Sequence, residues 1–212
     1  MAKVVLADLN RKTVKFRIRG TSPLIQHQWS EKAKQQMREK SGGRKTKTRE
    51  ARDPMAEAEA CLYRTAEGEI GINGMAFKCS LISAAHKDIG IEKTLVRKAI
   101  FLVTKDPGRV LPMTTGTSAM QVTKQFCPCG AAIREDLVRV GVGSADLRYR
   151  PQFDEWAVDI ELEIDNDLLQ VEDILKLVNR AGFGVGIGEW RPEKSGEFGR
   201  FEIDDTVEVT VD

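Results

Sequence analysis

Strict alternation of apolar and polar residues predicts two strands whose outer faces carry opposite charge. In residues 13–19, Val14, Phe16 and Ile18 alternate with basic residues, which is typical of a half-buried strand with a basic outer face. Residues 156–164 alternate in the same way, but their outer positions are mostly acidic. Further strands are expected over residues 70–72, the end of 94–104, 137–142, 147–153 and 201–211.

Helical patterns lie between these strands. We expect helices over residues 30–37, 74–89 and 171–181, the last with one apolar stripe and with Gly182 as its C-terminal stop. Residues 55–64 favour either a helix or a transition into a strand. This order of elements fits an antiparallel sheet with helices packed on one face, which is an α+β fold.

Two stretches are too polar or too irregular to contribute to a core. Residues 38–52 are heavily basic and contain Ala51 as their one apolar residue, which predicts a flexible basic insertion at about 38–53. It is either a solvated loop or a phosphate-binding arm, and its charge favours the arm. Prolines and glycines interrupt residues 106–134, which predicts an irregular insertion at about 105–135. We expect a single domain over residues 1–212 that contains both insertions.

Composition excludes several classes of protein. With 41% hydrophobic and 31% charged residues, the chain has the composition of a soluble globular protein, and no apolar run is long enough to span a membrane. The N-terminal residues lack an apolar signal segment, so we expect a cytoplasmic protein with reduced cysteines. Cys127 and Cys129 form a C-x-C pair, and His27 and His86 are the two histidines, which argues against a zinc site. We therefore expect neither a metal nor a cofactor.

The small net charge conceals a strong asymmetry along the chain. Residues 11–52 contain 14 Lys and Arg against three Glu, whereas residues 151–212 contain five Lys and Arg against 17 Asp and Glu. This polarity predicts a basic surface for a polyanion and a separate acidic surface. It is also compatible with head-to-tail association of copies of the chain.

The most informative segment is the glycine-rich stretch at residues 182–201. It matches neither a phosphate-binding Walker A loop nor a dinucleotide-binding fingerprint, because its glycines follow a helix instead of opening one. It places glycines around Trp190, Arg191 and Lys194 between a predicted helix and a predicted strand. Glycines permit close approach of the backbone to a phosphodiester, or alternatively a tight crossover between helix and strand.

These features resemble the RAMP superfamily, the RNA-binding proteins that form the backbone of CRISPR effector complexes. Residues 186–191 (GIGEWR) and 196–201 (GEFGRF) look like the C-terminal glycine-rich loop of that family. Residues 20–24 (GTSPL) look like the end of its first strand, and residues 72–78 (INGMAFK) resemble its segment near bound RNA. The whole chain also resembles a family of bacteriophage proteins, which implies a bacterial host cell.

The resemblance implies a ferredoxin-like (RRM-like) antiparallel sheet with helices on one face and basic loop insertions. It also implies assembly along a single strand. We expect a non-enzymatic, sequence-tolerant protein that binds single-stranded RNA or DNA and forms a homo-oligomer or filament, with no catalytic residue and no membrane partner. The expected nucleic-acid-binding residues are Lys32, Lys34, Arg38, Arg44, Lys45, Lys47, Arg49, Arg52, Lys78, Gly186, Gly188, Trp190, Arg191, Lys194 and Arg200.

Two other functions remain open at this point. A histidine titrates near neutral pH, so His27 after the first strand is the candidate base of a RAMP-type endoribonuclease. A bacteriophage assembly or anti-defence protein would use the charge polarity for protein contacts alone. Trp190 itself is either a stacking residue for a base or a loop tryptophan packed on the core.

Overall fold

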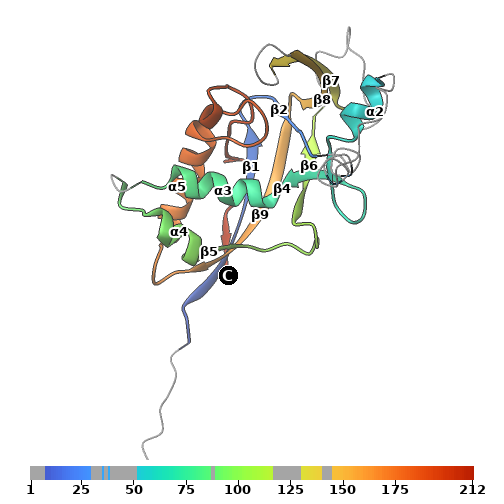
Figure 1. The fold of residues 1–212 in the computed structure, drawn as a ribbon. Coiled ribbons are helices and arrows are strands. Elements are labelled where there is room, and N and C mark those ends of the chain that lie inside the picture. The colour runs from blue at the N-terminus through green and yellow to red at the C-terminus, as the bar shows by residue number, and fades with distance from the viewer. Residues whose placement is uncertain are drawn as a thin grey trace, which may run out of the picture.

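The computed structural model describes residues 8–29, 35, 38, 52–86, 89–116, 130–139 and 145–212. These residues form a mixed α+β fold with two antiparallel sheets, which confirms the predicted class (Figure 1). No helix in these ranges combines the length and the apolarity that a membrane span requires.

The large sheet contains the two alternating strands at its centre. Its strand order is β10-β1-β9-β6-β4-β3, with β11 paired to β1 and β5 paired to β9, all antiparallel. The strands are β1 (Arg11–Gly20), β3 (Tyr63–Arg64), β4 (Ile70–Asn73), β5 (Ile100–Leu102), β6 (Val110–Thr115), β9 (Trp156–Asp165), β10 (Phe201–Ile203) and β11 (Thr210–Val211).

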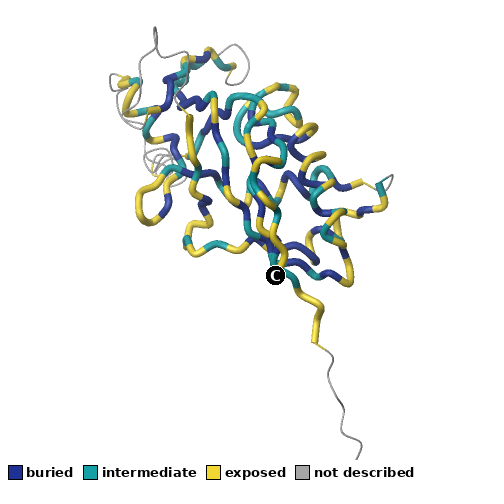
Figure 2. Tube along the Cα trace, turned by 180° about the vertical axis from the view of Figure 1, so that it is seen from behind, coloured by how far each residue is buried: buried dark blue, intermediate teal, exposed yellow. Residues whose placement is uncertain are grey.

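Three helices pack on one face of this sheet: α3 (Gly74–Ala84), α4 (Lys93–Ala99) and α5 (Val171–Gly184) (Figure 1). The buried residues lie mainly along the central strands and the helix surfaces that cover them (Figure 2). On β1, Phe16 and Ile18 are opposite Ile160 and Val158 of β9, and all four are buried. Period-two alternation therefore places one apolar row of each strand under the helices.

A second, three-stranded sheet lies at one end of the molecule (Figure 1). It consists of β2 (Leu24–Ile25), β8 (Ala145–Phe153) and β7 (Ala132–Arg139), in that order. Helix α2 (Pro54–Glu59) packs against β8 and is capped by Asp53, whose carboxylate accepts hydrogen bonds from the backbone N–H groups of Met55 and Ala56.

On the outer face of the large sheet, the basic and acidic residues of the two alternating strands do not form the separate surfaces that the sequence predicts. The basic outer row of β1 lies directly beside the acidic outer row of β9, with Arg17 paired to Asp159 at 2.7 Å and Arg11 paired to Glu163 at 3.0 Å. The basic strand of the first charged segment and the acidic strand of the second are thus neighbours in one sheet.

Some predicted boundaries are wrong. Helix α5 continues through Gly182 to Gly184, and Gly182 serves packing instead of ending the helix, since an added Cβ would lie 1.8 Å from the carbonyl oxygen of Phe201. Helix α3 ends at Ala84, five residues before the predicted end. The predicted final strand is split into β10 and β11 by a turn at residues 204–207.

The predicted insertions have different outcomes. Part of the segment expected to be irregular forms β6, which lies between β4 and β9 in the large sheet. Most of the expected helix at 30–37, most of the basic insertion, and residues 117–129 with Cys127 and Cys129 lie outside the described residues.

Candidate functional site

The glycine-rich segment after α5 forms a compact loop that is tied to the small sheet. The backbone N–H of Glu189 donates to the carbonyl of Ile25 at 3.0 Å, and that of Gly199 donates to the carbonyl of Pro23 at 2.8 Å. Gly186, Gly188 and Gly199 have positive φ, and a Cβ on Gly188 would lie 2.5 Å from the Ile25 carbonyl oxygen. These close approaches are to the chain's own backbone, so the glycines are explained by the tight turn between helix and strand.

Trp190 occupies the outer end of this loop in an unusual conformation. Its φ is +54°, in the left-handed region, and 42% of its surface is exposed. Such backbone strain costs about 1–3 kcal/mol at a non-glycine residue and often marks a functional position. The two ends of the segment from Trp190 to Phe198 are in contact, because the Phe198 N–H donates to the Trp190 carbonyl. A Cβ on Gly196 would lie 1.7 Å from the same oxygen.

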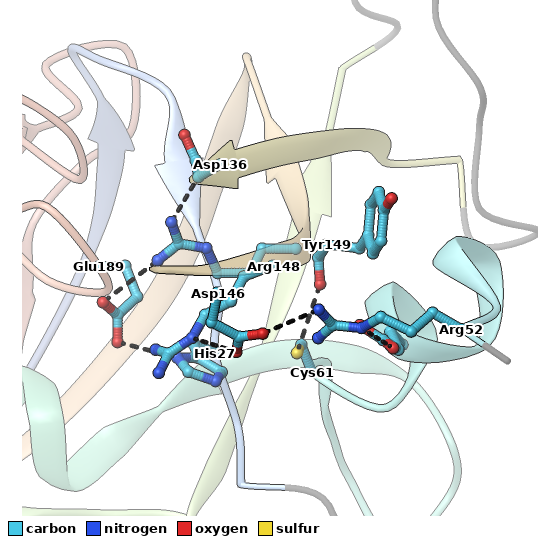
Figure 3. A network of polar contacts seen from close by, with 10 residues as sticks. His27, Arg52, Cys61, Asp136, Asp146, Arg148, Tyr149 and Glu189 are labelled. Carbon is cyan, nitrogen blue, oxygen red and sulfur yellow. Dashed lines mark hydrogen bonds and ion pairs between the residues drawn. The ribbon is translucent and has the colours of Figure 1, made fainter. Parts of the chain in front are cut away.

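Arg150 of the small sheet lies against this tryptophan and belongs to a row of charged residues, of which Figure 3 shows Asp136 and Arg148. Alternation along β8 places Arg148 and Arg150 on one face, and the register with β7 places Asp136 and Arg134 opposite them. The Arg150 side chain is 1% exposed, and its guanidinium lies 5.9 Å from the centre of the Trp190 ring. It donates to Asp136 at 2.6 Å and to Glu189 at 3.4 Å.

Glu189 connects this row to His27. Its carboxylate lies 3.3 Å from the Nδ1 atom of His27, and it also contacts Arg150 (Figure 3). The hydrogen bond with His27 is the main cause that lowers the pKa of Glu189, and the charges of Arg150 and Arg148 lower it further against the effect of burial. Glu189 is therefore ionised at neutral pH.

The position of His27 follows from Gln26 beside it. Gln26 is buried and joins the segment after β2 to the large sheet: its side-chain N–H donates to the carbonyl of Gly71 at 2.9 Å, and its side-chain oxygen accepts from the N–H of Tyr63 at 3.1 Å. His27 remains partly exposed, and Trp29 two residues later is 53% exposed.

The arginines of this site are mostly paired. Arg134 donates to Asp136 at 2.9 Å and lies 4.8 Å from the Phe198 ring. Arg52 contacts Asp146 at 2.9 Å, and Arg148 is 3.8 Å from the same carboxylate (Figure 3). Among the described residues this long contact is the one ion pair of Arg148, and its side chain is 35% exposed, so it is the arginine of β8 most able to meet a ligand.

The structure divides the residues predicted from the sequence among several places. Trp190, Arg191 and Lys194 share the glycine-rich loop, where Arg191 bonds Glu193 and the Gly188 carbonyl. Arg52 belongs to the network beside β8, whereas Arg200 lies over Phe183 and lines a different depression.

Lys78 lies apart from this network. It is on α3, 4.5 Å from the Phe101 ring, and burial lowers its pKa. Arg38 is exposed and helical. The other predicted residues lie outside the described ones: Lys32, Lys34, Arg44, Lys45, Lys47 and Arg49.

The described residues offer no group of three or more His, Cys, Asp and Glu side chains placed to hold a metal ion. Cys61 is buried, and burial raises the pKa of its thiol to about 11, so it is protonated at neutral pH.

Sequence reasoning missed Arg134, Asp136, Arg148, Arg150 and Glu189. A local signal existed for two of them, because two arginines alternate with apolar residues in the predicted strand at 147–153. No protein-family model matches this chain, and a search of curated proteins finds no match to it.

Proposed function

We propose that this chain is a RAMP-type protein that binds single-stranded nucleic acid through a surface made by residues 26–29, β8 and the loop at 186–199. We call this the Trp190 surface. The observation that supports it best is Trp190, held exposed and strained over the buried Arg150, which shares one face of β8 with the partly exposed Arg148. An aromatic side chain beside arginines is a typical stacking platform for a base of a single strand.

The pairing of the arginines determines what each contributes. Arg150 is neutralised by Asp136 and Glu189, so it orients the Trp190 ring and attracts phosphate weakly. Arg148 supplies a phosphate contact at the edge of the stacked base. The remaining phosphate contacts come from the basic segment at 38–53, which is expected to bind without reading base sequence.

The topology supports a ferredoxin-like core. Taking β1, β5, β9 and β10 as its four strands, α3 and α4 lie between the first two and α5 lies between the last two. The first and third strands are central, with the fourth beside the first and the second beside the third, as in a βαββαβ core. This agreement and the resemblance of residues 186–191 and 196–201 support the RAMP assignment.

The proposal is tested by measuring the binding of fluorescently end-labelled RNA and DNA 20-mers with fluorescence anisotropy. Trp190→Ala should weaken binding about fivefold or more, since stacking contributes about 1–3 kcal/mol per base. Trp190→Phe should retain most of the affinity. Arg148→Gln should weaken binding, whereas Arg97→Gln on the exposed surface of α4 serves as the matched control. Absence of binding by the unmodified protein would overturn the proposal.

A second candidate function is RNA cleavage by His27, and the contact between His27 and Glu189 favours it. A carboxylate bonded to one ring nitrogen orients an imidazole so that the other nitrogen can accept a proton from a 2′-hydroxyl. Incubation with single-stranded RNA in the presence of a chelator tests this function. Cleavage that His27→Ala abolishes, with binding retained, would establish an endoribonuclease.

A further inference from the structure

A second aromatic and arginine pair lies at the other end of the glycine-rich segment. There, α5, β10 and the end of β1 surround a depression of about 430 Å³, which is within the size range of small-ligand sites. Phe183 from α5 and Arg200 next to β10 line it, together with Thr21 and Asn179. None of these four residues belongs to the Trp190 surface.

Phe183 provides a flat apolar wall in an exposed position. It lies in the last turn of α5 with 72% of its surface exposed, although it is a large aromatic residue. The Arg200 guanidinium lies 4.9 Å from the ring centre, and Arg200 forms no ion pair within the described part of the chain. The pair thus presents an aromatic ring and an unpaired cation side by side.

Two groups that can donate hydrogen bonds line the depression together with this ring. The Asn179 side chain lies one helical turn before Phe183, so both side chains are on the same side of α5. Its oxygen accepts from the Ile203 backbone N–H at 2.9 Å, which leaves its NH₂ group as a donor. Thr21 adds a hydroxyl that can donate or accept.

The charges of the depression limit the ligand that fits it. Arg19 also lines the depression, but it is paired with Glu202 at 2.9 Å and with Asp205 at 3.6 Å. Two cations and two carboxylates therefore balance, so a free phosphate would meet both carboxylates and leave the apolar ring unused. A planar, uncharged heterocycle with acceptor atoms on its edge uses the ring and the Asn179 donor together.

We infer that this depression is a second binding site for a base of a single-stranded nucleic acid, stacked on the open side of Phe183 with its edge toward Asn179. This inference rests on the proposed function. The unpaired Arg200 supplies a contact to a phosphate next to that base. Phe183 and Trp190 are seven positions apart, so their Cα atoms are at most about 25 Å apart, and one strand of several nucleotides reaches both side chains.

Binding of a labelled RNA or DNA 20-mer to Phe183→Leu tests the site. The affinity should fall about fivefold or more, while the slope of log affinity against log salt stays unchanged because no ionic contact is lost. Phe183→Tyr should restore binding. Phe101→Leu is the matched control, since Phe101 is also exposed with a cation over its ring but lies on β5, across β9 from β1.

A strand that contains 5-iodouracil locates the base directly. Irradiation of the complex should form an adduct on Phe183 that peptide mapping identifies, and Phe183→Leu should lack it. Equal affinity of Phe183→Leu and the unmodified protein, with Trp190→Ala weakened, would overturn the second site and leave the proposed function standing. If the unmodified protein binds no strand, both fall together.

Discussion

Replacing the buried Arg150 with Met should destabilise the small sheet and its contact with the glycine-rich loop. Arg150 is 1% exposed, and its guanidinium joins Asp136 of β7 to Glu189 of the loop. Met has a similar length and fills the space, so the change removes the charge and its hydrogen bonds with little loss of packing volume.

The size of the loss in unfolding free energy depends on the contacts that Asp136 and Glu189 retain without Arg150. Removing one partner of a buried ion pair costs about 3–5 kcal/mol, because the other charge stays buried without compensation. Here Asp136 keeps two contacts of 2.9 Å with Arg134, and Glu189 keeps His27 and is 40% exposed. The expected loss is therefore at the lower end, about 3 kcal/mol. This is a large share of the roughly 5–15 kcal/mol by which a domain is stable.

Urea unfolding followed by far-UV circular dichroism measures this loss by linear extrapolation. Arg148→Met is the matched control on the same strand, since its side chain is 35% exposed and its contact with Asp146 is 3.8 Å long. Its loss should stay below about 1 kcal/mol, as for exposed ion pairs. Equal losses for the two variants would refute the view that the Arg150 network holds the loop on the small sheet.

Two further predictions concern acid and salt. The pKa of Glu189 is lowered in the folded protein, so its contribution to stability is complete above its usual pKa of 4.5 and is lost as the pH falls through the lowered value. In urea unfolding at pH 3–7, Glu189→Gln should therefore lose less stability toward acid pH than the unmodified protein. An equal loss toward acid pH in both proteins would contradict this role of Glu189. Salt dependence of binding tests the basic segment through a variant with alanine at Arg44, Lys45, Lys47 and Arg49. The slope of log affinity against log salt should become shallower by about 0.7 per lost phosphate contact. An unchanged slope with an intact fold would exclude this segment from binding.

The parts of the fold with a strong one-sided pattern were predictable. β1 and β9 bury one row of side chains and leave the other wholly or partly exposed, so the alternation alone identified both strands. Gly182 shows why boundaries failed: glycine is the usual residue after a helix end, but here the close approach of Phe201 requires it inside α5. That approach joins residues 19 positions apart, and no local pattern reports it.

The candidate site was predictable where its residues are local and not where it depends on tertiary pairing. Trp190 stands out beside its glycines, and the strand at 147–153 was expected. Which face of that strand turns toward the loop depends on how the small sheet packs, so Arg150 gave no signal of its burial. The partner of His27 is Glu189, 162 positions later in the chain, and this carboxylate is unremarkable among the many acidic residues of the C-terminal part.

Pairing of the strands neutralises part of the charge asymmetry seen along the chain. Four of the five basic residues of β1 have a carboxylate partner, including Lys15 with Asp212 at 3.3 Å and Arg19 with Glu202 at 2.9 Å. Such exposed pairs stabilise the fold by about 0–1 kcal/mol each, but a paired cation has little net charge for a polyanion. Arg52 is likewise paired, with Glu57 and Asp146, so within residues 11–52 the remaining attraction comes mainly from the eight basic residues at 32–49. If that segment also contacts acidic residues of a second copy, nucleic acid competes for the same charges, so binding and head-to-tail assembly should share one salt dependence.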